Sequence, residues 1–277
     1  MKNIWKKIIT GLTVFLVIIG SGHITSVAAK IHEKTPFLTT EENDKIGIGL
    51  PTVIPKNKGE NVKINSNNKV IEGESETLNI SLVPSTSGTT IQVPLELGKG
   101  ENAVLYQNEL GRSFNSGNLY NKENHSIGII NAEVINNDGK AQLTTTIKNN
   151  NILLLNVKAQ NVSKLIHIQV KMNATSFSTY FTKSEWIHRS GITSLSLSQK
   201  PDISSSKNSD LNKVIKVDAW DKIKSIHTSN DKWYNPEGMK DQFDCHFDFA
   251  KKKNLWNLEP HRPDLDYFST VLASCNP

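Results

Sequence analysis

The sequence predicts a β-rich N-terminal sandwich or open barrel, followed by a small α+β C-terminal module stapled by a disulfide. Three observations predict this fold class. Short segments that alternate apolar and polar residues recur through residues 76–172, with turn-forming residues between them. Residues 177–277 combine strand-like and helix-like patterns. The only two cysteines, Cys245 and Cys275, both lie in this second region.

The composition fits a folded chain and argues against a nucleic-acid binder. Charged residues make up 21% of the 277 residues, and the formal net charge is +5. Residues 1–29 hold three lysines and no acid, so the remainder carries 29 bases against 27 acids, a net charge of +2. This near balance lacks the concentrated positive charge that binding to a phosphate backbone requires.

Residues 1–29 have the features of a cleaved signal peptide. Lysines precede an apolar run at 8–19, and the small residues at 26–29 follow it (SVAA). The alternative is an uncleaved anchor helix, which needs about 20 apolar residues to span a bilayer. We therefore expect a secreted protein with no membrane span after cleavage, either released or associated with the wall.

Residues 30–75 are expected to form a largely flexible linker or pro-segment. Residues 56–69 (KNKGENVKINSNNK) are almost wholly polar and offer little apolar surface to offset the entropy of ordering. A short apolar patch at 46–54 could still add an edge strand.

Residues 76–172 are expected to form an all-β domain. Apolar residues alternate with polar ones at 78–82, 91–97, 104–106, 127–129, 143–147, 153–157 and 166–170. Turn-forming residues stand between these segments, at 87–88, 98–100, 115–117, 137–139 and 149–151. Repeated short strands of this kind are typical of a sandwich or an open barrel.

The first half of the C-terminal module, residues 177–277, is expected to contain strands and a short helix. Residues 186–188 and 192–197 read as two strands joined by a turn at 189–191. Residues 214–217 resemble another strand because Val214, Ile215 and Val217 are β-branched. Asp218 is then placed to cap a short helix that has Trp220, Ile223 and His227 on one face.

Two further helices are expected to carry one cysteine each. Asn235 and Pro236 provide an N-cap and a first helical residue, and apolar residues follow at helical spacing to Ala250. The alternation at 243–249 also permits a strand. Pro263 is expected to open a last helix whose apolar stripe is Leu265, Phe268, Leu272 and Cys275. A disulfide between the helices would contribute roughly 3–4 kcal/mol; the alternative is two separate buried thiols.

Several short motifs in the C-terminal module resemble a known family. They are residues 241–246 (DQFDCH), 256–260 (WNLEP), 262–263 (RP) and 275–277 (CNP), together with Trp186 and residues 194–197 (SLSL). In order, spacing and chain-terminal position they are similar to a C-terminal domain of unknown function found in secreted bacterial proteins. The β region resembles one that often precedes such modules in exported Gram-positive proteins, through residues 93–97, 119–122 and 137–140. The resemblance implies no activity, substrate or catalytic residue.

His246, Asp241 and Asp248 are the candidates for catalysis. An imidazole near a carboxylate provides the minimal parts of a general-base pair. On a helix, however, His246 and Asp248 diverge by about 200°. The competing interpretation places His246 on the apolar stripe beside the cystine, where it would form local hydrogen bonds.

Trp256, Arg262 and Glu259 are the candidates for ligand binding, and the competing interpretation is structural, with Arg262 clamping Glu259 or Asp241. His246 and His261 lie near acids but match no known ligand spacing, so we expect no metal and no cofactor. Residues 251–253 (KKK) follow a predicted helix, and they either cap its C-terminus or attract an anionic envelope surface.

We expect a non-enzymatic interaction protein whose partner is a cell-envelope polymer or another exported protein. Whether the chain is an enzyme stays open, and the alternative is a secreted hydrolase or toxin-like effector that uses His246. A third hypothesis treats residues 30–172 as a pro-region that is removed to release an active C-terminal module.

Overall fold

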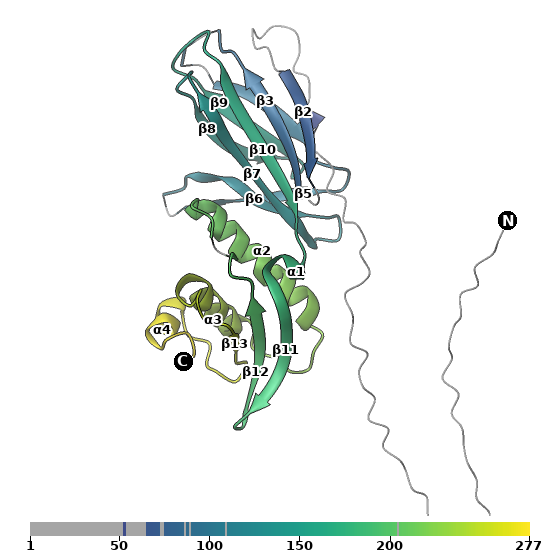
Figure 1. Cartoon of the computed structure of the whole chain (residues 1–277), viewed down its shortest axis with the longest axis vertical. Helices are drawn as coiled ribbons and strands as arrows, with labels where there is room; N and C mark the ends of the chain where they lie inside the picture. Colours follow the sequence, from purple (N-terminus) through teal and green to yellow (C-terminus); the bar gives the residue numbers. More distant parts are fainter. Residues whose placement is uncertain are drawn as a thin grey trace, which may run out of the picture. The chain divides into compact units, whose positions relative to one another are not determined.

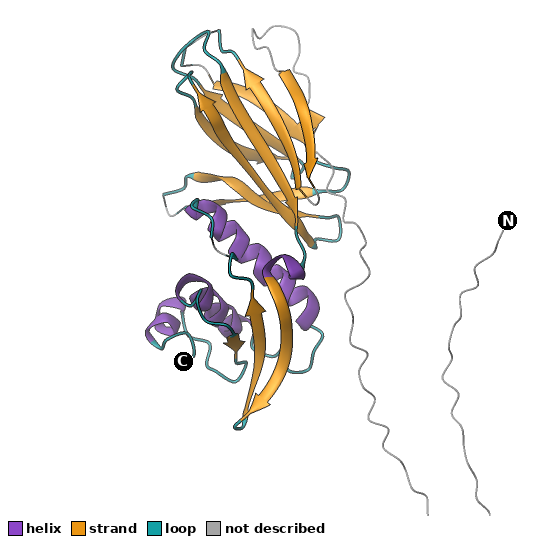
Figure 2. Cartoon of the chain, viewed as in Figure 1, coloured by secondary structure: helices purple, strands orange, loops and turns teal. Residues whose placement is uncertain are grey.

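The β region folds as two antiparallel sheets that share one apolar core, which confirms the predicted β-rich fold class (Figures 1 and 2). The computed structural model describes residues 52–53, 65–72, 75–85, 87–88, 90–108, 110–203 and 205–277. The predicted signal peptide and most of the predicted linker lie outside these residues.

The smaller sheet has four strands in the order β1 (Thr52–Val53), β4 (Thr90–Glu96), β9 (Ile152–Lys158) and β8 (Gln142–Lys148). The larger sheet has six, in the order β2 (Asn65–Glu72), β3 (Ser75–Leu82), β10 (Ile166–Ala174), β7 (Ser126–Asn137), β6 (Ser113–Tyr120) and β5 (Asn102–Gln107). Alternate residues of facing strands, such as Val93, Leu155, Ile80 and Ile168, are fully buried between the sheets. The period-2 pattern of the sequence therefore identified the inward face of β3, β4, β9 and β10. At β5 the predicted face was wrong, because Val104 is 43% exposed and its neighbour Ala103 is buried.

Two edge strands lie where the sequence predicted little structure. β1 lies within the apolar patch at 46–54, where an edge strand was considered possible, and it pairs with β4. β2 pairs with β3, although five of its eight residues belong to the polar stretch at 56–69. An edge strand obtains backbone hydrogen bonds from one neighbour, so pairing does not require an apolar pattern.

The predicted turn at 115–117 is wrong, because these residues lie inside strand β6. Asn118 is fully buried there and donates to the carbonyl oxygen of Val214 at 3.3 Å. At Gly117 the chain runs so close to β5 that a Cβ atom would stand 2.3 Å from the carbonyl oxygen of Val104. Glycine and asparagine here serve close packing, and the usual association of these residues with turns was misleading.

The C-terminal module has a second apolar core between a three-stranded sheet and helices (Figure 2). Its sheet order is β11 (Phe181–Arg189), β12 (Ile192–Gln199) and β13 (Trp256–Leu258), and a four-residue helix α1 (Phe177–Tyr180) precedes it. The predicted hairpin is confirmed, with its turn at Ser190 and Gly191, which both have positive φ. Strand β13 was not predicted.

The strand predicted at 214–217 and the helix cap at Asp218 are wrong. One helix, α2 (Ser209–His227), contains both, and the side chain of Asn208 caps it by accepting from the backbone N–H groups of Asp210 and Leu211. Val214, Ala219, Trp220 and Ile223 are buried along it. Burial on a helical period outweighed the local β-preference of the valines and isoleucine.

Helix α3 (Pro236–Phe249) confirms the predicted helix, including its start: Asn235 accepts from the N–H of Gly238 at 3.3 Å, and Pro236 is the first residue. The last helix differs from prediction. α4 (Tyr267–Leu272) is capped by Asp266 rather than opened by Pro263, and Cys275 lies beyond its end. Phe268 and Leu272 are 68% and 71% exposed, so the stripe expected to face the core faces outward.

Helix α2 joins the two parts of the chain, which belong to one compact unit, Asp44–Pro277. It packs along β6 and β7 on one side and contacts α3 on the other (Figure 1). The separation into domains at 76–172 and 177–277 stays a prediction. No helix among the described residues is long and apolar enough to cross a membrane.

Candidate functional site

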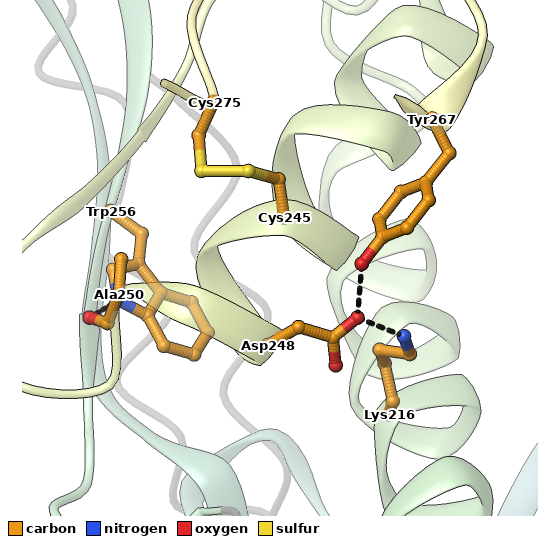
Figure 3. Close-up of a disulfide and its surroundings, with 7 residues drawn as sticks. All are labelled: Lys216, Cys245, Asp248, Ala250, Trp256, Tyr267 and Cys275. Atoms are coloured by element: carbon orange, nitrogen blue, oxygen red, sulfur yellow. Dashed lines mark hydrogen bonds and ion pairs between the residues drawn. A yellow bond between two sulfur atoms is a disulfide. The ribbon is translucent and has the colours of Figure 1, made fainter. Parts of the chain in front are cut away.

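The disulfide between Cys245 and Cys275 fixes the end of the chain to α3 (Figure 3). Cys245 lies on α3, and the two Cα atoms are 5.3 Å apart although 30 positions separate the residues in sequence. One turn further along α3, the Asp248 carboxylate accepts from the Tyr267 hydroxyl at 2.6 Å and from Lys216 Nζ at 2.8 Å (Figure 3). These contacts place α4 beside α3.

His246 is a core residue, with 2% of its surface exposed. Its ring stacks on Trp256 at a centroid distance of 6.1 Å and an interplanar angle of 12°. Neither ring nitrogen forms a hydrogen bond of normal geometry among the described residues, although the backbone of Asn257 and the side chain of Asn276 approach the ring and partly oppose the lowering of its pKa. Burial, followed by the nearby charge of Lys253, lowers the pKa of His246 from 6.5 to about 4. The imidazole is therefore neutral at physiological pH and shielded from any substrate.

The carboxylates proposed to act with His246 make other contacts. Asp248 is bonded to Lys216 and Tyr267. Partial burial, then the negative charges of Asp244 and Asp264, raises the pKa of Asp241. No hydrogen bond joins His246 to either carboxylate among the described residues, so the structure does not bring the three catalytic candidates together.

The binding candidates also make internal contacts. Trp256 is fully buried, and its indole N–H donates to the carbonyl oxygen of Ala250 at 3.0 Å (Figure 3). Arg262 Nε donates to Glu259 at 2.6 Å, which is the clamp that the structural interpretation described. A second guanidinium N–H of Arg262 donates to the carbonyl oxygen of Pro277 at 2.7 Å. Arg262 thus holds the last residue of the chain.

The residues that carry the sequence resemblance contact one another. Gln242 is fully buried; it donates to the carbonyl oxygen of Glu259 at 3.2 Å and accepts from the Glu259 N–H at 2.8 Å. The disulfide, the stacking of His246 on Trp256 and the clamp of Arg262 complete this network. Gln242, Glu259 and Arg262 therefore have a structural explanation, in which they position the loop between α3 and α4.

Sequence reasoning missed a buried polar cluster where α2 meets the β region. Asp218 is fully buried and accepts from the hydroxyls of Ser126 and Tyr180. Lys222, one turn along α2, lies 3.8 Å from Asp218, donates to the carbonyl oxygen of Ser126 and has a pKa lowered by burial. The signal was the spacing of four between Asp218 and Lys222, which becomes visible only once both are assigned to one helix.

A cleft of about 880 Å³ lies beside this cluster, lined by residues that include Tyr120, Phe177, Asp221 and Lys224. Its charged groups are paired with one another: Lys224 Nζ is 2.8 Å from Asp221, which also accepts from the Tyr120 hydroxyl at 2.9 Å. No group of three or more His, Cys, Asp or Glu side chains able to hold a metal occurs among the residues that the structure describes.

A further exposed segment of the module is both basic and apolar. Residues 249–255 (FAKKKNL), which we call the basic–apolar loop, carry exposed Phe249 and Leu255 on either side of three exposed lysines. Phe249 is 67% exposed and Leu255 is 49% exposed. Large apolar side chains are also exposed at Tyr234 and, on α4, at Phe268 and Leu272.

Comparison with known families identifies the C-terminal region. Residues 181–277 match the family described as protein of unknown function (DUF2599). The DUF2599 region therefore begins at strand β11 and includes both cysteines, α3 and α4, in agreement with the resemblance found in the sequence. Searches of curated proteins and of solved structures gave no match.

Proposed function

We propose that this chain is a secreted bacterial protein that acts by binding at the cell envelope or outside the cell, without catalysing a reaction. The observation that carries the proposal is the contrast within the DUF2599 region. The polar residues that sequence reasoning offered for chemistry make internal contacts, while the basic–apolar loop and the outer face of α4 are exposed.

The exposed apolar side chains of α4 lie on a short helix that a disulfide and a hydrogen bond attach to α3. α4 has only six residues, and its inner side buries Thr270 while Phe268 and Leu272 point outward. A disulfide and the Tyr267–Asp248 hydrogen bond attach this short helix to α3. Exposed apolar groups rimmed by polar residues are typical of interaction surfaces.

Export is supported by the chemistry of the cysteines and by the N-terminal sequence. The Cys245–Cys275 disulfide is compatible with an oxidising compartment. Residues 1–29 have the pattern of a signal peptide.

The alternative of a secreted hydrolase is less favoured, because His246, its proposed general base, is buried. A general base has to reach the proton that it abstracts, and His246 lies beneath Trp256 with a pKa of about 4. The pro-region hypothesis also meets a physical obstacle. Removal of the β region would expose the Asp218–Lys222 pair and take away the hydroxyl of Ser126.

The proposal is tested with the chain that begins at Lys30, incubated with intact bacterial cells and with purified wall sacculi. Saturable pelleting with one or both, without release of soluble wall or protein fragments, is expected. A His246→Phe variant should pellet equally well, because the ring lies in the core. Release of soluble products that His246→Phe abolishes would establish the hydrolase instead.

A further inference from the structure

Strand β11 is an open edge of the three-stranded sheet. The order β11–β12–β13 leaves its outer side without a neighbouring strand among the described residues. Its pairing with β12 is regular over residues 183–189, because the one irregularity lies between Phe181 and Lys183. Figure 1 shows the tip of this hairpin extending beyond the helices of the module. A regular open edge offers unpaired backbone groups to another strand.

Other edge strands among the described residues are short, interrupted or covered. β1 and β13 have two and three residues, and the pairings of β2 and β5 each contain an irregularity. β8 is bonded to β6, since the side chain of Asn115 donates to the carbonyl oxygen of Leu143 at 3.1 Å. These features keep a sheet edge from pairing with another chain. Residues 183–189 of β11 have none of them.

The hairpin turn determines which backbone groups of β11 face the open side. The two turn residues, Ser190 and Gly191, both have positive φ, and such a two-residue turn makes Arg189 and Ile192 a hydrogen-bonded pair. Hydrogen-bonded and non-hydrogen-bonded pairs then alternate along the strands. The backbone N–H and C=O groups that point to the open side are those of the intervening residues, Ser184, Trp186 and His188.

A second copy of the chain has the same open edge, and charge distinguishes the ways in which two β11 strands can pair. Antiparallel pairing must place outward-facing residues opposite each other, which permits registers centred on residues 184 to 188. A centre at 185 places Glu185 against the partner's Glu185, and a centre at 186 places Lys183 against the partner's Arg189. Like charges directly opposite are destabilising. A centre at 184 or 188 pairs only 183–185 or 187–189 of the regular segment.

The register centred on Ile187 avoids these conflicts. It pairs the whole of 185–189 with its copy, and Glu185 lies opposite the partner's Arg189 on both sides of the axis. Ile187 is partly buried and meets the partner's Ile187 between these two ion pairs. Opposite charges therefore flank an apolar centre.

The neighbouring charges leave Glu185 and Arg189 available for these contacts. Arg189 is exposed and forms no ion pair among the residues that the structure describes. Glu185 pairs with Lys183 at 2.8 Å, but its side chain is 49% exposed, so a second cation can approach it. In this register Lys183 lies opposite the partner's Gly191, which has no side chain. Strand β12 carries no charged residue.

We propose that two copies of the chain associate through β11 in this antiparallel register and so form one continuous sheet. On the face that carries Trp186, the indole lies opposite the partner's His188, and the backbone groups of these two residues face each other. His227 of α2, whose ring is 6.0 Å from that of Trp186, adds no charge there at physiological pH, because burial lowers its pKa to about 4. The paired segment is short, so we expect a dimer that depends on concentration. Envelope binding does not require this dimer, which goes beyond the proposed function.

Analytical ultracentrifugation of the chain from Lys30, which contains the whole unit Asp44–Pro277, tests this association. The sedimentation coefficient should rise with concentration towards the value for a dimer. Glu185→Arg and Arg189→Glu should each weaken association roughly tenfold or more, because each creates two like-charge contacts across the axis. An equimolar mixture of the two variants should associate again, since every arginine at these positions then faces a glutamate of the other variant.

Two further variants separate the edge of β11 from other surfaces. Glu123→Arg is the matched control, because Glu123 is 51% exposed and lies 3.4 Å from a neighbouring lysine, much as Glu185 does. It should associate like the unchanged chain. His188→Pro removes an outward-facing N–H group and no backbone bond to β12, so it should abolish association. Cooperative urea unfolding would confirm that this variant is folded.

Sedimentation as a monomer at every concentration would overturn the proposal. Association that Glu123→Arg weakens as much as Glu185→Arg does, or that His188→Pro leaves intact, would also overturn it, since the dimer would then use another surface. Failure of the mixed variants to associate would refute the register centred on Ile187.

Discussion

Asp218 is a buried charged residue at the junction between α2 and the β region. It is fully buried, receives hydrogen bonds from Tyr180 and Ser126, and lies 3.8 Å from the buried amine of Lys222. Removing one partner of a buried ion pair costs about 3–5 kcal/mol, whereas replacing both with apolar groups is often nearly neutral.

We therefore expect Asp218→Asn to lower the free energy of unfolding by about 3 kcal/mol, because the Lys222 amine loses its buried counter-charge. The double variant Asp218→Asn with Lys222→Met should regain most of that loss. Urea unfolding measures both. A cost below about 1 kcal/mol for the single variant would contradict the assigned role.

His246 should make stability depend on pH between 6.5 and 4. Its pKa is about 4 in the folded chain because the ring is buried, against 6.5 when exposed. The unfolded chain therefore takes up the proton at a higher pH than the folded chain does. The contribution of His246 to the free energy of unfolding is fully present above pH 6.5 and is lost as the pH falls towards 4. The loss is up to about 3 kcal/mol. His227, whose pKa burial also lowers to about 4, should add a similar loss.

The His246→Phe variant isolates this effect. A phenyl ring retains the stacking on Trp256 and carries no proton, so the variant should lose less stability than the unchanged chain on acidification. Urea unfolding above pH 6.5 and near pH 4 provides the comparison, and carboxylate contributions cancel between the two proteins. Identical pH dependence in both would show that His246 titrates freely.

Residue-level interpretation from sequence succeeded where partners are close in the chain. The Arg262–Glu259 pair spans three positions and could be anticipated. The contact of Arg262 with Pro277 could not, because it depends on the chain end being brought back by the disulfide. Asp218 was wrongly assigned as a helix cap. A capping aspartate and a buried aspartate cannot be distinguished in the sequence unless the residue that contacts it, here Ser126 of β7, is known.

At the scale of elements, α4 is expected to depend on the disulfide. A helix of six residues is too short to be stable in isolation. Replacing Cys245 and Cys275 with Ala should lower the free energy of unfolding by roughly 3–4 kcal/mol, given the 30-residue separation.

Hydrogen exchange can locate that loss. The amide protons of Thr270 and Ala273, which bond to Asp266 and Ser269, should exchange much faster in the variant without cysteines. Amides of the sandwich strands β9 and β10 should keep their protection. Unchanged protection in α4 would mean that packing alone holds the helix.

Element prediction was accurate for strands with strict alternation and for α3, whose N-cap and proline are local signals. It failed for β6, where Asn118 and Gly117 serve packing against α2 and β5. It failed for the first half of α2, where burial against β6 decides the conformation. Both failures concern residues at the junction, where each element's pattern depends on the other.

At the scale of the whole molecule, the β region and the DUF2599 region should unfold together. The hydrogen bonds from Tyr120 to Asp221 and from Ser126 to Asp218 cross the junction, as does the packing of α2 on β6. All tryptophans after Trp5 lie at or beyond Trp186, so their fluorescence reports the C-terminal region, while the backbone amide NMR signals of β9 and β10 report the sandwich.

Urea transitions followed by the two signals should therefore coincide for the chain from Lys30. An earlier fluorescence transition would mean that the C-terminal region unfolds independently. The sequence could indicate two regions, because their residue patterns differ, but it could not indicate their coupling, which is carried by single side chains distant in the chain.

The central claim is that the exposed surface of the DUF2599 region binds the cell envelope. The most direct test is pelleting of the chain from Lys30 with intact bacterial cells, comparing Phe249→Ser with Leu110→Ser. We predict saturable pelleting that Phe249→Ser weakens and Leu110→Ser leaves unchanged. Absence of pelleting, or equal pelleting by both variants and the unchanged chain, would contradict the claim.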